Sequence, residues 1–324
     1  MKIRIISLLC AALTIGMAQT SQAESFEAWL YQMRGKAARA GISETTINAA
    51  FQGIKPIERV IELDRKQPEG RLTLAQYIDK IVSHDRIKKG RALYKKHYNT
   101  LQKIEAKYGV QAEYVVALWG IETNYGGFTG GTKTLSALAT LAHEGRRRDF
   151  FTKELINALT IIDQGHITAR DMKGSWAGAL GQNQFMPSSF LAYAVDENND
   201  GRKDIWATLV DVFGSSSNYL SKSGWHGDER WGREVVLPNK GISQSMIDIK
   251  KEKPLSYWRE KGVKTTSGQP IPVVEGMKAS LIQPDGTGNK AYLVYNNYKV
   301  LLKWNRSTYF ATSVGLLAEA IAAP

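Results

Sequence analysis

The spacing of apolar residues changes near residue 226, and this change constrains the fold more than any other feature of the chain. Before it, apolar residues recur with helical spacing, as in "AEYVVALWGIE", where Val115, Trp119 and Glu122 follow an i, i+4, i+7 pattern. After it come the short β-like runs "REVVLP", "PVVEG", "KASLIQP", "KAYLVYN" and "VLLKW", and a closing helix, "FATSVGLLAEAIAA". The pattern predicts an α+β, mainly helical fold with a small C-terminal α/β part.

The first 23 residues predict a secretory signal peptide. Basic residues precede an apolar stretch over residues 5–15, and "SQA" provides small residues for cleavage after Ala23. The stretch is too short to anchor the protein across a bilayer. The only cysteine, Cys10, lies within it. We therefore expect a soluble exported protein without disulfides, located in the periplasm.

Length and charge narrow the class of partner. The remaining stretch of about 300 residues is long enough for a large core, in one domain or in two closely joined lobes. A formal charge of +12 suits an anionic polymer. The chain carries no nucleic-acid motif, and the export signal argues against such a partner, so cell-wall glycan peptides and acidic lipid head groups fit better.

Two segments of the helical part carry sharper signals. "SETTINAAFQGI" places Ser43 to cap a helix, and "RIKKGRALYKKHYNTLQKIEAKYG" places Leu93, Leu101 and Ile104 on one face of a Lys-rich helix. "GSWAGALGQNQFMPSSF" is too rich in glycine, and too broken by Pro187, to form one continuous helix.

Glu122 ends an apolar run in "LWGIETNYGG" and points where the apolar side chains point. Burial and the negative end of the helix dipole both raise the pKa of such a carboxyl group. Gly126 and Gly127 are stop signals that leave Glu122 at the rim of a cleft. A carboxylic acid that stays protonated near neutral pH suits a general acid. The alternative is a structural glutamate bonded to a loop.

Six segments together resemble the lytic murein transglycosylase B family, a lysozyme-like group that cleaves peptidoglycan. They are "VALWGIETNYGGFTGG", "TLSALATLA", "GSWAGALGQNQFMPSSF", "DENNDGRKDIW", "DVFGSSSNYL" and "LLKWNRSTYFA", in family order. The resemblance implies an N-terminal helical region (24–108), a lysozyme-like catalytic core (109–225) and a C-terminal β-rich segment with a closing helix (226–324) that completes the lobes around the groove.

The resemblance also implies which side chains meet the substrate. Glu122 is the single catalytic acid and base. The side chains implied around it are Ser175, which hydrogen-bonds the glutamate, and the groove residues Gln184, Tyr219, Trp304, Asn305 and Tyr77. Trp304 and Phe310 stand where the family has tyrosines, so stacking on sugar is retained without the hydroxyl contacts. Alternatively, the polar residues satisfy loop backbone groups and the tyrosines pack in the core. Residues 146–148, all arginine, either meet stem-peptide carboxylates or form a solvated turn.

A single acid sets the expected mechanism. Retaining and inverting glycosidases generally need two carboxylates, and Asp149 and Asp163 lie in no matching motif. The resemblance implies that Glu122 protonates the oxygen between N-acetylmuramic acid and N-acetylglucosamine. It then takes the proton of the muramyl C6 hydroxyl, which attacks C1 and closes a 1,6-anhydro ring. Intramolecular attack makes a second carboxylate less necessary. The alternatives are a hydrolytic muramidase and a non-catalytic peptidoglycan-binding scaffold protein.

The expected partners are peptidoglycan glycan strands, with proteins of cell-wall synthesis or division as further candidates, and we expect a monomer. No cofactor is required. A structural Ca²⁺ is the one candidate, because "DENNDGRKDIWA" matches a calcium loop at positions 1, 3, 5 and 9, and relatives bind calcium there. The candidate ligands are Asp196, Asn198, Asp200, Asp204 and the later Asp211. Position 12 holds Ala207 instead of glutamate, which weakens binding.

Overall fold

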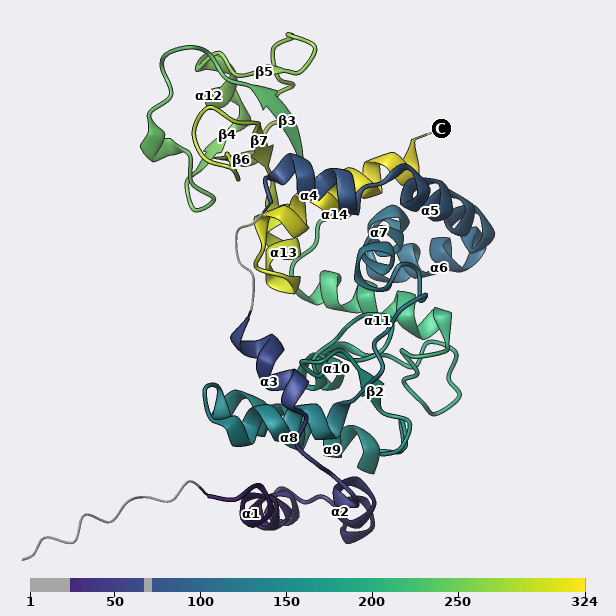
Figure 1. Ribbon diagram of the computed structural model, residues 1–324. Helices are drawn as coiled ribbons and strands as arrows, with labels where there is room; N and C mark the ends of the chain where they lie inside the picture. Colours follow the sequence, from purple (N-terminus) through teal and green to yellow (C-terminus); the bar gives the residue numbers. More distant parts are fainter. Residues whose placement is uncertain (1–23, 67–71, 324) are drawn as a thin grey trace, which may run out of the picture.

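The computed structural model describes residues 24–66 and 72–323. The predicted signal peptide, its cleavage after Ala23 and Cys10 therefore lie outside the described residues. Within them, no helix is long and apolar enough to cross a membrane. Helices dominate, accompanied by a two-stranded and a five-stranded antiparallel sheet (Figure 1). The predicted α+β, mainly helical fold class is confirmed.

The N-terminal part is helical, as predicted. Its helices are α1 (Phe26–Arg39), α2 (Glu44–Phe51), α3 (Glu58–Arg65), α4 (Leu74–Ile81), α5 (His84–Lys96) and α6 (Tyr98–Tyr108). Ser43 caps α2 by accepting a hydrogen bond from the N–H of Thr46, which confirms its predicted role.

The single Lys-rich helix predicted across residues 86–109 is wrong, because the chain bends at His97 between α5 and α6. The His97 ring packs edge-on against Trp119 and Phe213. The bend lets Leu101 and the rest of the apolar face of α6 reach the core independently of α5.

The middle of the chain surrounds one buried helix. Its elements are α7 (Ala112–Thr123), β1 (Thr132–Lys133), α8 (Thr134–Glu144), α9 (Arg148–Asp163), β2 (Lys173–Gly174), α10 (Pro187–Tyr193) and α11 (Leu209–Lys222). Helix α7 packs against α5, α6, α11 and α14 near the centre of Figure 1, so nearly all of its side chains are buried. The glycine-rich segment 174–190 is not one helix, as predicted: turns follow β2, and Pro187 opens α10.

A small β lobe follows, drawn at the upper left of Figure 1. Its elements are β3 (Gly232–Val236), a 3-10 turn (Gln244–Met246), β4 (Glu252–Pro254), α12 (Leu255–Glu260), β5 (Lys264–Thr265), β6 (Lys278–Ile282) and β7 (Ala291–Val294). The strands lie in the antiparallel order β4-β6-β7-β3-β5. The lobe has its own apolar core, in which Trp258, Leu281 and Leu293 are fully buried.

The chain then returns to the main core through α13 (Asn296–Trp304) and α14 (Thr308–Ala322). The β-like reading of "VLLKW" is wrong, because these residues belong to α13. Asn297, Tyr298, Val300 and Leu301 are buried with helical spacing, which a five-residue apolar run cannot reveal. "PVVEG" is also irregular: Pro272 lacks a ladder donor, and the two valines after it are exposed.

Candidate active site

Glu122 lies in the last turn of α7, whose apolar face buries Val115 and Trp119. The helix ends before the two glycines, because Asn124 and Tyr125 already adopt left-handed backbone conformations with φ of 51° and 61°. The half-buried carboxyl group therefore stands where the chain reverses. Burial raises the pKa of Glu122 to about 7, and a hydrogen bond from Trp304 opposes that rise. The predicted elevation of its pKa is confirmed.

Trp304 and Tyr219 form an aromatic wall beside Glu122. The indole Nε1 of Trp304, at the end of α13, donates a 2.8 Å hydrogen bond to Oε1 of the glutamate. The ring of Tyr219, on α11, meets the Trp304 ring edge-on at 4.8 Å, and its hydroxyl donates to the carbonyl of Lys303. Phe185 packs against both rings. The structure thus brings two of the predicted groove residues to the catalytic candidate.

Tyr77, on α4, approaches Glu122 from another element. Burial raises the pKa of the Tyr77 hydroxyl, and the negative charge of Glu122 raises it further, which requires the two groups to be near each other. Tyr77 packs edge-on against Tyr309. Asp285, between β6 and β7, accepts hydrogen bonds from the N–H of Leu74 at 2.8 Å and from the Tyr309 hydroxyl. The β lobe therefore holds the start of the helix that carries Tyr77, a connection that sequence reasoning missed.

Nearby backbone groups form hydrogen bonds with the side chains of Ser175, Gln184 and Asn305. Ser175 Oγ accepts the N–H of Ala179 at 3.0 Å, and no hydrogen bond between the residues described here joins it to Glu122. Gln184 Nε2 donates to the carbonyl oxygens of Thr129 and Gly181. Asn305 Oδ1 accepts from Ser307. The glutamate's hydrogen-bond partner in this structure is Trp304.

Two of the three consecutive arginines are held by a buried acid. Arg146 and Arg147 both pair with the carboxylate of Asp64 on α3, at 2.6 Å each. Asp64 is only 3% exposed, so these contacts balance a buried charge. Arg148 donates to the carbonyl of His143 instead. The structure therefore gives these arginines local partners within the fold.

The two further carboxylates considered in the sequence stand elsewhere. Asp163, at the end of α9, accepts hydrogen bonds from the backbone and side chain of Ser43. Asp149 is exposed in the first turn of the same helix. Neither carboxylate is among the causes of the pKa shift of Glu122, which are burial and the Trp304 hydrogen bond.

The acidic loop 196–211 is closed by its own backbone. Asp196 accepts from the N–H groups of Asp200 and Gly201, and Asp211 accepts from those of Glu197 and Asp204, at 2.8 to 3.1 Å. Burial and nearby acids raise the pKa of Asp211. The remaining candidate ligands are Asn198, hydrogen-bonded to Asp200, and Asp204, which accepts from the N–H groups of Trp206 and Ala207. Within 24–66 and 72–323, no three acidic, histidine or cysteine side chains cluster to hold a metal ion.

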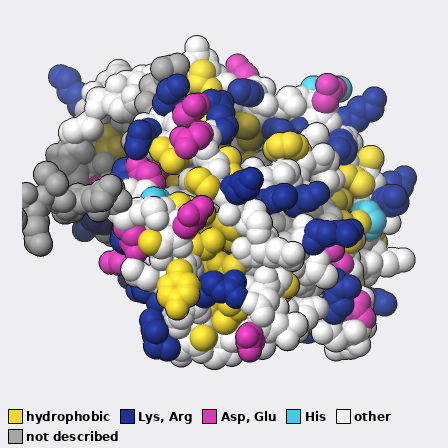
Figure 2. Space-filling view, turned by 60° about the horizontal axis from the view of Figure 1, so that its bottom comes forward, with side chains coloured by type: hydrophobic (Ala, Val, Ile, Leu, Met, Phe, Trp, Pro, Cys, Tyr) yellow, Lys and Arg dark blue, Asp and Glu magenta, His cyan; other side chains and the backbone are white. Residues whose placement is uncertain are grey.

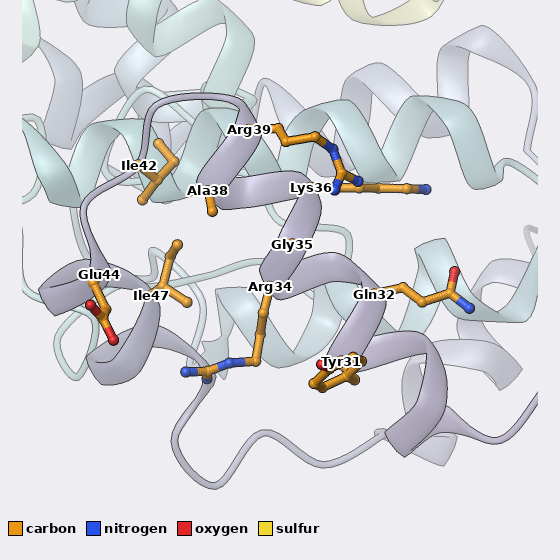
Figure 3. A pocket seen from close by; sticks show the side chains of 10 residues that line it. All are labelled: Tyr31, Gln32, Arg34, Gly35, Lys36, Ala38, Arg39, Ile42, Glu44 and Ile47. Carbon is orange, nitrogen blue, oxygen red and sulfur yellow. The ribbon is translucent and has the colours of Figure 1, made fainter.

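A surface groove lies between α1 and α2, away from this site (Figure 3). Ile42 and Ile47 give it an apolar floor, and Arg34, Lys36 and Arg39 are its basic side chains. No residue predicted for the active site lines it. On the face shown in Figure 2, Lys and Arg side chains are interspersed with acidic and hydrophobic ones. Because no predicted active-site residue lines this groove, we take the cluster around Glu122 as the candidate active site.

Residues 25–319 match the transglycosylase SLT domain family. Over 250 residues, the chain is 33% identical to the membrane-bound lytic murein transglycosylase B of Escherichia coli (strain K12), covering 76% of this chain and 67% of that protein.

Solved structures agree with this match. SltB3 from Pseudomonas aeruginosa, in complex with NAG-NAM-pentapeptide, has a TM-score of 0.89 at 40% identity, over 93% of this chain and 80% of that chain. Slt35 of Escherichia coli, in complex with calcium, has a TM-score of 0.77 at 28% identity, over 90% and 92% of the two chains. This chain therefore belongs to the lytic murein transglycosylase B family and is a lytic transglycosylase with a lysozyme-like fold that acts on peptidoglycan.

Proposed function

We propose that Glu122 is the sole general acid and then the general base in cleavage of the bond between N-acetylmuramic acid and N-acetylglucosamine. The observation that carries this proposal is a carboxyl group with a pKa of about 7, next to an aromatic wall and hydrogen-bonded by Trp304. A group with this pKa is substantially populated in both protonation states near neutral pH. It is therefore able to give a proton in one step and to take one in the next.

In the first step, protonated Glu122 gives its proton to the glycosidic oxygen as the bond to muramyl C1 breaks. The N-acetylglucosamine hydroxyl leaves, and the muramyl N-acetyl group stabilises the positive charge that develops at C1. In the second step, the Glu122 carboxylate takes the proton of the muramyl C6 hydroxyl while that oxygen bonds to C1. The 1,6-anhydro ring closes, no water enters the product, and the glutamate regains its proton.

Two observations favour ring closure over hydrolysis. Asp149 is exposed, and Asp163 is hydrogen-bonded to Ser43. We therefore assign neither residue as a second catalytic carboxylate. In addition, SltB3 has been solved in complex with NAG-anhNAM-pentapeptide, at 40% identity and a TM-score of 0.88 to this structure, over 92% of this chain and 80% of that chain. Both observations support a nucleophile supplied by the substrate itself.

The aromatic residues around Glu122 fit the binding of sugar rings. Trp304, Tyr219 and Tyr77 come from three different helices and lie near the same carboxyl group. Ring faces and edges of this kind pack against the apolar faces of sugars, while polar tips bind hydroxyl groups. We extend the groove to Ser175, Gln184 and Asn305. Beyond their local contacts, the Ser175 hydroxyl is able to donate, Gln184 Oε1 to accept and Asn305 Nδ2 to donate.

The setting of the enzyme follows from the sequence. We propose export to the periplasm through the N-terminal 23 residues and action there as a monomer on glycan strands, with proteins of wall synthesis or division as candidate partners. We also keep the division into an N-terminal helical region (24–108), a catalytic core (109–225) and a C-terminal segment (226–324). Helices α13 and α14 of that last segment return to the main core, so the groove is formed by distant parts of the chain.

Mass spectrometry of the muropeptides released from purified peptidoglycan tests the mechanism. The mature protein should release anhydromuramyl products, each one water lighter than a hydrolysis product. Glu122→Gln should stay folded and release none. Glu113→Gln is a matched control, because Glu113 lies on the same helix and burial also raises its pKa. It should release the same products as wild type.

The other outcomes separate the alternatives. Products with reducing muramyl ends would identify a hydrolytic muramidase that uses a second carboxylate. Wild-type release by Glu122→Gln would exclude Glu122 as the catalytic acid, and absence of release by the wild-type protein would favour a binding or scaffold role.

A further inference from the structure

Gln182 connects three segments of the molecule, and all of its polar groups are used. It is only 7% exposed. Its side-chain Oε1 accepts from the indole Nε1 of Trp119 at 2.7 Å, and its Nε2 donates to the carbonyl of Trp206 at 2.8 Å. Its backbone N–H donates to the carbonyl of Ile205 at 2.8 Å, and its own carbonyl, at 3.3 Å, shares the hydroxyl proton of Thr123 with the carbonyl of Trp119, at 3.2 Å.

Two of these contacts hold the end of helix α7 on either side of Glu122. Trp119 lies just under one turn before the glutamate, and Thr123 is the next residue after it. The Thr123 hydroxyl also accepts the N–H of Gly126 at 3.0 Å, which closes the reversal that follows the helix. A Cβ on Gly126 would lie 2.3 Å from Gln182 Oε1, so only glycine fits against this side chain. The last turn of α7 and the reversal therefore both rest on Gln182.

The last turn of α7 needs such support. Asn124 and Tyr125 adopt left-handed conformations that non-glycine residues occupy only when the surrounding structure imposes them. The Glu122 carboxyl group must also meet Trp304, which comes from a helix far along the chain. Small displacements of a proton donor reduce the rate of the reaction more than they reduce binding, because the transition state depends on the direction of transfer.

We propose that Gln182 is a positioning residue: it fixes the last turn of α7 against the segment 205–206 and thereby orients the Glu122 carboxyl group toward the scissile bond. The inference rests on the proposed catalytic role of Glu122. Glutamine suits this place because one amide supplies both the acceptor for Trp119 and the donor for Trp206.

The competing explanation is that Gln182 only stabilises the core. The neighbouring Asn183 separates the two explanations, because it is 2% exposed and its Nδ2 also makes two 2.7 Å hydrogen bonds. Both bonds go to α11, to the carbonyl of Val212 and the hydroxyl of Ser216. Asn183 is thus also a buried amide, although its Oδ1 has no hydrogen-bond partner among residues 24–66 and 72–323, and the hydrogen bonds of its side chain go to α11 rather than to the helix of Glu122.

The test compares Gln182→Met, Asn183→Leu and Glu122→Gln with wild type. Each protein is assayed for its melting temperature and, well below it, for kcat and KM on a soluble muropeptide oligomer. Both Gln182→Met and Asn183→Leu should melt at lower temperature than wild type. Gln182→Met should lower kcat by about ten-fold to a hundred-fold with KM changed by less than about two-fold. Asn183→Leu should keep the wild-type kcat.

A second variant changes the contact between Gln182 and α7 on the α7 side. Thr123→Val keeps the shape of a 1% exposed side chain and removes the hydroxyl that the carbonyls of Gln182 and Trp119 share and that accepts from Gly126, so it should also lower kcat. It decides the matter if Gln182→Met fails to fold.

Three results would overturn the inference. They are a wild-type kcat in both Gln182→Met and Thr123→Val (or in Thr123→Val alone if Gln182→Met fails to fold), an equal loss of kcat in Asn183→Leu, and a loss confined to KM. Glu122→Gln keeps the two proposals separate. If it retains activity, the proposed mechanism fails; if it is inactive while Gln182→Met and Thr123→Val have the wild-type kcat, only the positioning role of Gln182 fails.

Discussion

The indole N–H of Trp304 donates a 2.8 Å hydrogen bond to the carboxyl group of Glu122, although the two residues are 182 positions apart in the sequence. Burial and this bond act in opposite directions on the glutamate. Burial disfavours the carboxylate, whereas the indole stabilises it, and together they leave its pKa at about 7. In the proposed mechanism, the group acts first as an acid and then as a base, so its hydrogen-bond donor must leave both protonation states accessible, which a neutral N–H does better than a cation would.

Replacing Trp304 with phenylalanine should move the pH profile of the enzyme. The variant loses the hydrogen bond that lowers the pKa of Glu122, so the pKa should rise further. Because the general acid must be protonated in the free enzyme, the alkaline limb of kcat/KM should move to higher pH by about one unit. Profiles on a soluble muropeptide oligomer would measure this. Tyr193→Phe, which alters another ring packed on Tyr219, should leave the limb in place.

The elevated pKa of Glu122 also has a consequence for stability. The ordinary value of 4.5 applies to the unfolded chain, so between pH 4.5 and about 7 the unfolded state releases a proton that the folded state keeps. Folding therefore loses stability as the pH rises through this window. Glu122→Gln removes the effect, because an amide does not titrate in this range, while its oxygen is still able to accept from Trp304.

We expect Glu122→Gln to match wild type in free energy of unfolding near pH 4 and to exceed it by about 2 to 3 kcal/mol above pH 7.5. Urea unfolding across this range measures the difference. Glu113→Gln tests whether the effect belongs to any buried glutamate of α7, since burial also raises the pKa of Glu113. A difference between Glu122→Gln and wild type that does not change with pH would contradict the elevated pKa of Glu122.

The helix that carries Glu122 could be predicted from the sequence because its signal is local. The spacing of Val115, Trp119 and Glu122 predicts one buried face, and the structure buries the other faces of this helix as well. Burial of a carboxyl group at a helix end fixes the direction of its pKa shift. The fold class followed from the same kind of periodicity. Short runs were less informative: "VLLKW" reads as a strand, and only its packing in α13 shows a helix.

The partners of that carboxyl group could not be predicted, because they depend on contacts between distant segments. Resemblance pointed to Ser175 as the hydrogen-bond partner of Glu122, whereas in this structure Trp304 holds that place. In "GQNQF", spacing alone does not distinguish Gln182, which holds α7, from Gln184, which bonds to nearby loop carbonyls. No sequence pattern indicates the role of Asp285, because its hydrogen-bond partners lie on the distant helices α4 and α14.

Asp285→Ala should weaken substrate binding without removing catalysis. The variant frees the N–H of Leu74 at the start of α4 and the hydroxyl of Tyr309, on which Tyr77 packs. Leaving these two donors without their acceptor costs about 1 to 2 kcal/mol of stability. A looser α4 should raise KM several-fold while kcat falls less.

Melting curves and steady-state kinetics on the muropeptide oligomer measure both effects of Asp285→Ala. The control is Asp248→Ala, because Asp248 lies in the same lobe and its carboxylate accepts from the nearby N–H of Lys250. If Asp285→Ala and Asp248→Ala behave alike, the β lobe does not support the groove through Asp285.

The acidic loop 196–211 should bind calcium weakly. Asp196 and Asp211 already satisfy backbone N–H groups with both carboxylate oxygens, and Ala207 replaces the bidentate glutamate. With a Kd weaker than about 1 mM, 1 mM Ca²⁺ adds less than about 0.4 kcal/mol, so the melting temperature should stay within about 2 °C of a chelated sample. A rise of more than about 5 °C, lost in Asp196→Asn, would instead show that these oxygens turn from the backbone to the ion.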